Sequence, residues 1–154
     1  MKIGFVSIPL TGHLNPMTAL ARKLKACGHE VVFIGFPDIA PVVRAAGLDF
    51  VPCGEKEFPE GSIGKLYGQV STLRGLEVIR WTIRETSKEF FKVATEHLPQ
   101  KLAETGVEAL VLDMSFSFIE LVPMNLGMPY VQVWNNSPRG FHRRDSALWL
   151  QLAT

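Results

Sequence analysis

The chain has 154 residues, of which 47% are hydrophobic and 20% charged, so we expect a single folded domain rather than a disordered chain. The formal net charge is +1 and both signs are interspersed, so the overall charge indicates neither a nucleic-acid partner nor an acidic membrane. The two cysteines, Cys27 and Cys53, lack metal-site spacing and are too few for a disulfide framework, which favours a reducing, cytoplasmic setting.

The amino-terminal third predicts alternating strands and helices. Residues 2–9 form a short apolar run that is typical of a buried parallel strand. Asn15 is expected to cap the following helix and Pro16 to begin it, because apolar residues then recur every three or four positions until Gly28 ends the pattern. A strand, a helix and a strand follow at residues 30–36, 38–46 and 48–53.

The rest of the chain continues the alternation after a loop at residues 54–64, which we expect to be exposed and mobile. Helical spacing from residue 66 to 98 predicts one long or one interrupted helix. Strands at residues 108–113 and 129–134 flank a helix that ends near residue 126. This order predicts an α/β fold with a Rossmann-like, doubly wound parallel sheet. No apolar run is long enough to predict a transmembrane segment.

Two polar residues follow predicted strands that should be neighbours. In such sheets, ligands bind beyond the carboxyl ends of the strands, at the point where the strand order reverses. His13 follows the first strand and Asp113 ends the fourth, so the topology predicts that they lie close together. A carboxylate bonded to one ring nitrogen fixes the tautomer of a histidine, whose other nitrogen can then take a proton near neutral pH.

Structural roles are the alternative for the same residues. His13 could satisfy backbone groups in a turn, and Asp113 could cap the helix that follows it. Hydroxyls at Ser7, Thr11 and Ser115 would be nucleophiles only beside a base, and such residues more often cap helices or form turns. The chain has neither a GxGxxG nor a GxxxxGK[ST] motif, so a nicotinamide site and a P-loop nucleotide site are not supported.

The segment GHLNPMTALARKLKACGHEVVFIGFPD, which begins at Gly12, resembles the amino-terminal domain of nucleotide-sugar-dependent glycosyltransferases with two Rossmann domains, the GT-B architecture. It is similar to the bacterial branch that contains macrolide and zeaxanthin glucosyltransferases. The resemblance extends through EFPEGS, GVEALVLD and LGMPYVQVWN and covers residues 1–135, the expected acceptor-binding domain. Residues 136–154 do not match, and a frameshift near Asn136 or Ser137, or a truncation, would explain this tail.

The resemblance implies an inverting transferase that moves a sugar from a UDP-sugar, its co-substrate, to a hydroxyl of a hydrophobic small molecule, with no metal and no other cofactor. His13 would remove the proton of the acceptor hydroxyl, and Asp113 would support His13. Substrate contacts are expected from Thr11, Gly12, Asn15, Phe116 and Phe118. The second, donor-binding domain is expected to be missing, which would leave this chain inactive alone. The alternative is a noncatalytic Rossmann-like module that binds a small molecule or a protein.

Overall fold

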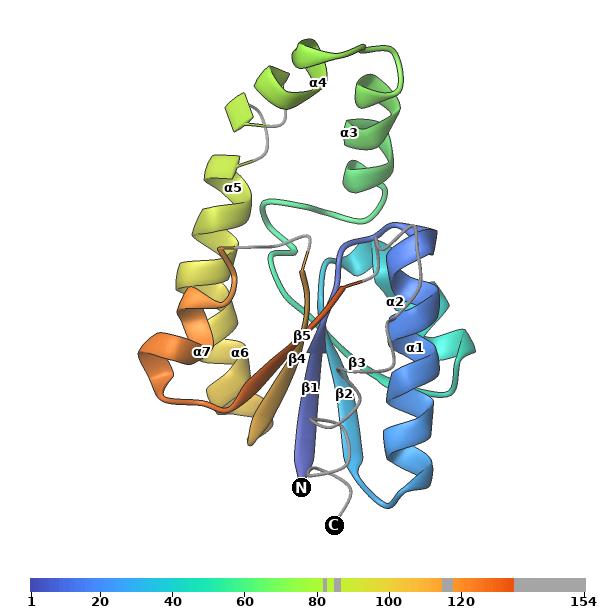
Figure 1. The fold of residues 1–154 in the computed structure, drawn as a ribbon, viewed down its shortest axis with the longest axis vertical. Helices are drawn as coiled ribbons and strands as arrows, with labels where there is room; N and C mark the ends of the chain where they lie inside the picture. The colour runs from blue at the N-terminus through green and yellow to red at the C-terminus, as the bar shows by residue number, and fades with distance from the viewer. Residues whose placement is uncertain (82, 85–86, 115–117, 135–154) are drawn as a thin grey trace, which may run out of the picture.

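The computed structural model describes residues 1–81, 83–84, 87–114 and 118–134, so the predicted tail at 136–154 lies outside the described residues. Its centre is a parallel sheet of five strands in the order β3-β2-β1-β4-β5 (Figure 1). The strands are β1 (Lys2–Val6), β2 (Glu30–Gly35), β3 (Asp49–Pro52), β4 (Ala109–Asp113) and β5 (Tyr130–Val133). The predicted Rossmann-like architecture is confirmed, with the strand order reversing between β1 and β4.

Helices cover both faces of this sheet (Figure 1). They are α1 (Thr11–Ala26), the 3-10 turn η1 (Pro37–Ile39), α2 (Ala40–Ala45), α3 (Ser62–Val70), α4 (Leu76–Trp81), α5 (Ser87–Lys92), the π-helical turn η3 (Val93–His97), α6 (Leu98–Thr105) and α7 (Leu121–Leu126). Within the described part of the chain, no helix has the length and apolar character needed to cross a membrane.

Helix α1 begins at Thr11, and not at Pro16 as predicted. Pro16 therefore lies inside the helix, and Asn15 is not its N-cap, which is Leu10. Proline lacks the N–H that would bond to the carbonyl four residues earlier, so the extension costs one helical hydrogen bond. The burial of side chains offsets this loss, because the helical residues before Pro16 include His13 and Leu14, which are both buried.

Glycines end the first two α-helices as the pattern predicts. Gly28 follows α1 with a φ of +88°, and the backbone N–H of His29 donates to the carbonyl of Leu24 at 3.2 Å. Gly47 follows α2 in the same way, with a φ of +71°. The left-handed conformation is unfavourable for side chains with a Cβ, so these glycines turn the chain into the next strand.

Two apolar cores pack on the two faces of the sheet. On the face covered by α1 and α2, Phe5 of β1 stacks on Phe33 of β2 with the ring centroids 5.1 Å apart. On the other face, Phe58 packs between Phe36 and Phe90, at centroid distances of 4.8 Å to each. Phe58 belongs to the loop that we predicted to be exposed, and the prediction is wrong for this residue, which is buried. Its aromatic side chain packs against the core and so holds the loop in place.

The predicted helical region at 66–98 is interrupted. Helices α3 and α4 rise beyond the carboxyl ends of the strands and form an arch, while α5, η3 and α6 return along the sheet (Figure 1). The π-helical turn precedes Pro99, which has no N–H to donate to the preceding turn. It also brings Lys92 and His97, five positions apart, to one carboxylate oxygen of Glu57, at 3.0 and 3.4 Å.

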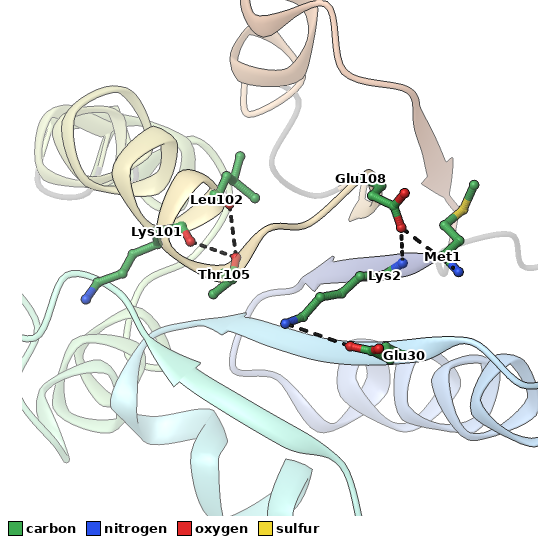
Figure 2. A network of polar contacts seen from close by, with 7 residues as sticks. All are labelled: Met1, Lys2, Glu30, Lys101, Leu102, Thr105 and Glu108. Atoms are coloured by element: carbon green, nitrogen blue, oxygen red, sulfur yellow. Dashed lines mark hydrogen bonds and ion pairs between the residues drawn. The ribbon is translucent and has the colours of Figure 1, made fainter.

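The opposite end of the sheet is fastened by polar contacts at the surface (Figure 2). The carboxylate of Glu108 accepts a hydrogen bond from the backbone N–H of Lys2 at 2.6 Å. The side chain of Lys2 lies 3.9 Å from Glu30, and Thr105 donates to the carbonyl of Lys101 at the end of α6. Contacts of this kind at the surface add little stability. The buried polar residues Ser7, His13 and Asp113 lie instead at the carboxyl ends of the strands.

Candidate functional site

His13 and Asp113 form a buried pair although 100 positions separate them in the sequence. Nδ1 of His13 lies 2.9 Å from Oδ2 and 3.0 Å from Oδ1 of Asp113. Only 1% of Asp113 and 9% of His13 is exposed. A carboxylate in this position accepts a hydrogen bond from the N–H at Nδ1, which selects one tautomer of the ring and stabilises its charged form.

The strand register explains why the pair forms. β1 and β4 are neighbours, and Val6 pairs with Leu112, so Ser7 and Asp113 leave the two strands at the same level. The chain then turns through residues 8–10, and α1 starts at Thr11 with its first turn above the end of β1. His13, the third residue of α1, lies on the buried side of this turn and reaches the carboxylate.

Ser7, which the sequence offered only as a nucleophile without a base, also belongs to this polar site, and the charge of Asp113 acts on Tyr67. The hydroxyl of Ser7 donates to Oδ2 of Asp113 at 2.9 Å, with only 1% of the residue exposed. Burial, and then the negative charge of Asp113, raise the pKa of the Tyr67 phenol. The signal for Ser7 was its position one residue beyond β1, opposite Asp113. Tyr67 belongs to α3 of the arch, and the effect of Asp113 on its pKa depends on tertiary structure alone.

Three of the other predicted substrate residues lie in the first two turns of α1. Thr11, Gly12 and Asn15 are exposed, and a Cβ built at Gly12 would meet no atom within 4 Å. Phe118 is half-buried, with its ring centroid 6.0 Å from that of Phe91. Phe116 lies outside the described residues. The surface beside His13 is therefore open at Gly12.

Asp113 does not cap α7, the described helix that follows it. That helix begins at Leu121 with Glu120 as its N-cap, seven residues beyond Asp113. The hydroxyl of Ser7 and the ring of His13 are among its hydrogen-bond partners. The alternative in which Asp113 caps a helix directly after it depends on residues 115–117, which lie outside the described residues.

A small apolar cavity lies on the inner side of Ser7. It encloses about 30 Å³, and its walls include Ser7, Phe36, Cys53 and Phe90. Burial, and then the charge of Glu55, raise the pKa of the Cys53 thiol to about 12. Cys53 is therefore a protonated core residue at neutral pH, and the cavity is too small for a drug-sized ligand.

The part of the chain that the structure describes contains no group of three or more His, Cys, Asp or Glu side chains arranged to hold a metal ion. The two free cysteines lie apart, with Cys27 exposed and Cys53 buried.

Sequence comparison relates the chain to glycosyltransferases, although no protein-family model matches it. It is 25% identical over 128 residues to the zeaxanthin glucosyltransferase of Pantoea ananas, which covers 83% of this chain and 29% of that protein. It is 27% identical over 120 residues to the glycosyltransferase GtfE of Amycolatopsis orientalis, which covers 77% of this chain and 27% of that protein.

Structural comparison gives the same result. The spinosyn rhamnosyltransferase SpnG matches with a TM-score of 0.63 and 25% sequence identity, over 86% of this chain and 34% of that one. The chain thus spans less than a third of the length of the two curated relatives and about a third of SpnG. By sequence and by fold, the chain is similar to the GT-B glycosyltransferases and matches part of an amino-terminal, Rossmann-like domain of theirs.

Proposed function

We propose that residues 1–135 form the acceptor-binding domain of a glycosyltransferase in which His13 is the general base. The observation that carries the proposal is the buried contact of 2.9 Å between Nδ1 of His13 and Asp113, at the point where the strand order reverses. Asp113 holds the ring in one orientation, and Ser7 holds Asp113 by donating to the oxygen that also faces His13. The remaining ring nitrogen, Nε2, is the atom assigned to the acceptor proton.

In the proposed reaction, Nε2 removes the proton of an acceptor hydroxyl, whose oxygen attacks the anomeric carbon of a nucleotide-diphosphate sugar. The bond from that carbon to the diphosphate oxygen breaks, and the nucleoside diphosphate leaves with the bonding electrons. Attack from the face opposite the leaving group inverts the configuration. The imidazolium that forms is stabilised by the carboxylate of Asp113, and holding both reactants in line lowers the barrier.

The substrate class follows from the surroundings of the site and from the relatives. The acceptor is proposed to be a hydrophobic molecule with a hydroxyl group, such as the zeaxanthin named for the Pantoea relative, bound beside Gly12 and Phe118. The donor is proposed to be a UDP-sugar, as in the name of the UDP-glucosyltransferase B1 of Starmerella bombicola, held by a second domain with no metal or other cofactor. The two free cysteines fit a reducing, cytoplasmic setting.

The test joins residues 1–135 to the donor-binding part of the Pantoea relative and measures sugar transfer from labelled UDP-glucose to a panel of hydrophobic alcohols. We expect no turnover by the unjoined chain and measurable turnover by the joined protein. His13→Gln should lower kcat about 10²–10⁴-fold, the usual contribution of a general base. His29→Gln, at the turn after α1, is the matched control and should leave the rate unchanged.

Two results would count against the proposal. Turnover by the His13→Gln protein at the rate of the unchanged protein would remove the assigned base. Saturable binding of an alcohol without any transfer by the joined protein would instead favour a noncatalytic binding module. The anomeric configuration of the product, read by NMR, tests inversion separately, because retention would exclude a single displacement.

A further inference from the structure

The second helix of the arch, α4, presents a row of aliphatic side chains to the outside. None of its residues is buried. Leu76 and Ile79 are 69% and 55% exposed, and Ile83, just beyond the helix, is 63% exposed. Leu76 and Ile79 are three positions apart within α4, which places them on one helical face, and Ile83 follows after the end of the helix. A contiguous apolar row of this kind on a folded protein marks an interaction surface.

Basic residues border the same row. Arg74, Arg80 and Arg84 are all exposed, and Glu77 is the one acidic residue between positions 74 and 84. In the sequence, Arg80 of α4 follows Ile79 directly, and Arg84, beyond the end of the helix, follows Ile83 directly. Arginine side chains in this position can lay their apolar stems along the row while their guanidinium groups reach outward. The overall charge of +1 hides this local excess of positive charge.

The position of α4 makes this face accessible. The helix lies at the tip of the arch, on the far side from the amino-terminal end of the sheet, and both apolar cores lie below it (Figure 1). The described residues closest in sequence, those of α3 and α5, descend from the tip toward the sheet. The exposed fractions of Leu76 and Ile79 show that their side chains are accessible at this tip.

We propose that this face of α4 docks on an anionic phospholipid surface. Aliphatic side chains bordered by arginines match the boundary between acyl chains and negatively charged headgroups. A second copy of this chain fits less well, because a symmetric contact through the row would bring the arginines of both copies together. The docking does not depend on the proposed glycosyl transfer. It would hold the carboxyl end of the sheet, where His13 and Asp113 lie, toward the membrane.

The experiment measures flotation of the full chain with two kinds of vesicle, one of phosphatidylcholine alone and one containing phosphatidylglycerol. Flotation is expected with the anionic vesicles and not with the neutral ones, and it should weaken as salt is added. Replacing Arg80 and Arg84 by Gln should lower the partition coefficient about 25-fold, at roughly fivefold per charge. Leu76→Ser with Ile79→Ser should abolish flotation.

A matched pair of substitutions on another exposed face is the control. Leu121→Ser with Met124→Ser changes two apolar side chains of α7 that are 50% and 60% exposed, and it should leave flotation unchanged. Because no α4 residue is buried, all variants should keep the far-ultraviolet circular dichroism of the unchanged chain. The proposal would be overturned if the chain floated equally with neutral and anionic vesicles, or if it did not float at all. It would also be overturned if the α7 pair of substitutions lowered flotation as much as the α4 pair. Light scattering that showed self-association lost only in the Leu76 and Ile79 variant would overturn it as well.

Discussion

Asp113 is a carboxylate almost wholly withdrawn from water, and its surroundings must therefore supply hydrogen-bond donors. A buried charge without partners is very costly, and the chain meets this requirement with the ring of His13 and the hydroxyl of Ser7. The two donors come from α1 and from the turn that follows β1. The site residues consequently contribute to folding as well as to the proposed chemistry.

The first prediction concerns Ser7. Ser7→Ala removes the donor to Oδ2 of Asp113 and leaves a buried charged acceptor with one hydrogen bond fewer. The free energy of unfolding, measured by urea titration, should fall by about 1.5–3 kcal/mol. The control is Ser71→Ala, which removes an exposed hydroxyl bonded to the carbonyl of Gly68 and should change stability by less than about 0.5 kcal/mol. If both variants lost the same free energy of unfolding, the hydrogen bond from Ser7 to Asp113 would contribute no more to stability than the exposed bond of Ser71.

The second prediction concerns Cys53 and pH. Its pKa is raised from 9.0 to about 12, so the folded state favours the protonated thiol more than the unfolded state does. The corresponding stability is fully present below about pH 9 and is lost as pH rises toward 12, on the order of 4 kcal/mol in all. Tyr67, whose pKa is also raised, acts in the same direction at alkaline pH.

Urea unfolding at several pH values above 8 measures this loss. Cys53→Ala lowers the absolute stability by leaving a cavity, but it should make the decline with pH shallower. Cys27→Ala, at the exposed cysteine, should leave the slope unchanged. A slope in the Cys53 variant as steep as in the unchanged chain would show that the buried thiol does not titrate in this window.

At the residue scale, the sequence was enough to predict that His13 and Asp113 meet, because the order of strands and the rule for parallel sheets place both at one switch point. It was not enough for Ser7, whose role depends on the register between β1 and β4. The charge of Asp113 contributes to the raised pKa of Tyr67 in the arch, and no local pattern in the sequence encodes that effect. The catalytic role of the pair remains a prediction for the transfer assay.

At the scale of elements, strand positions were predicted well and helix starts less well. The strands are short apolar runs with glycines or prolines at their ends, and these signals are local. The start of α1 was misplaced because Pro16 is a strong local signal for a first turn, whereas burial of His13 and Leu14 extends the helix backward. Tertiary packing thus overrode local preference.

The third prediction compares two glycines with positive φ. Gly54 has a φ of +77°, and a Cβ there would lie 2.8 Å from a methyl group of Val93. Gly47 has a similar φ of +71° and open space around it. Gly47→Ala should cost about 1 kcal/mol for the backbone alone, and Gly54→Ala about 3 kcal/mol because overpacking is added. Similar midpoints for both variants in thermal unfolding would show that the η3 turn yields to the added methyl group.

At the scale of the whole molecule, the sheet and the arch differ in how firmly they are held. β1 is hydrogen-bonded on both sides and packed between two cores, whereas α4 has no buried residue. The sheet order was predictable from strand–helix alternation. The arch was not, because its shape depends on where a long helical pattern breaks, and apolar spacing alone does not mark the break.

The fourth prediction follows from this difference. Hydrogen exchange followed by mass spectrometry should find the slowest amides in β1, β2 and β4 and the fastest helical amides in α4. Peptides from α7, a helix of the same length with two buried residues, serve as the internal comparison. Protection in α4 equal to that in α7 would indicate that the arch is held by contacts beyond those described.

The π-helical turn between α5 and α6 allows this helical segment to change in length by one residue. Such a turn accommodates one more residue than the α-helical turn it replaces. Leu98 and Leu102 of α6 can therefore stay packed on the sheet while the chain before them gains or loses a position. A variant with one residue deleted inside Val93–His97 should replace the π-helical turn by an α-helical one and keep those leucines on the sheet, with the missing hydrogen bond at Pro99 unchanged. The turn therefore allows the chain between the arch and the sheet to change length by one residue.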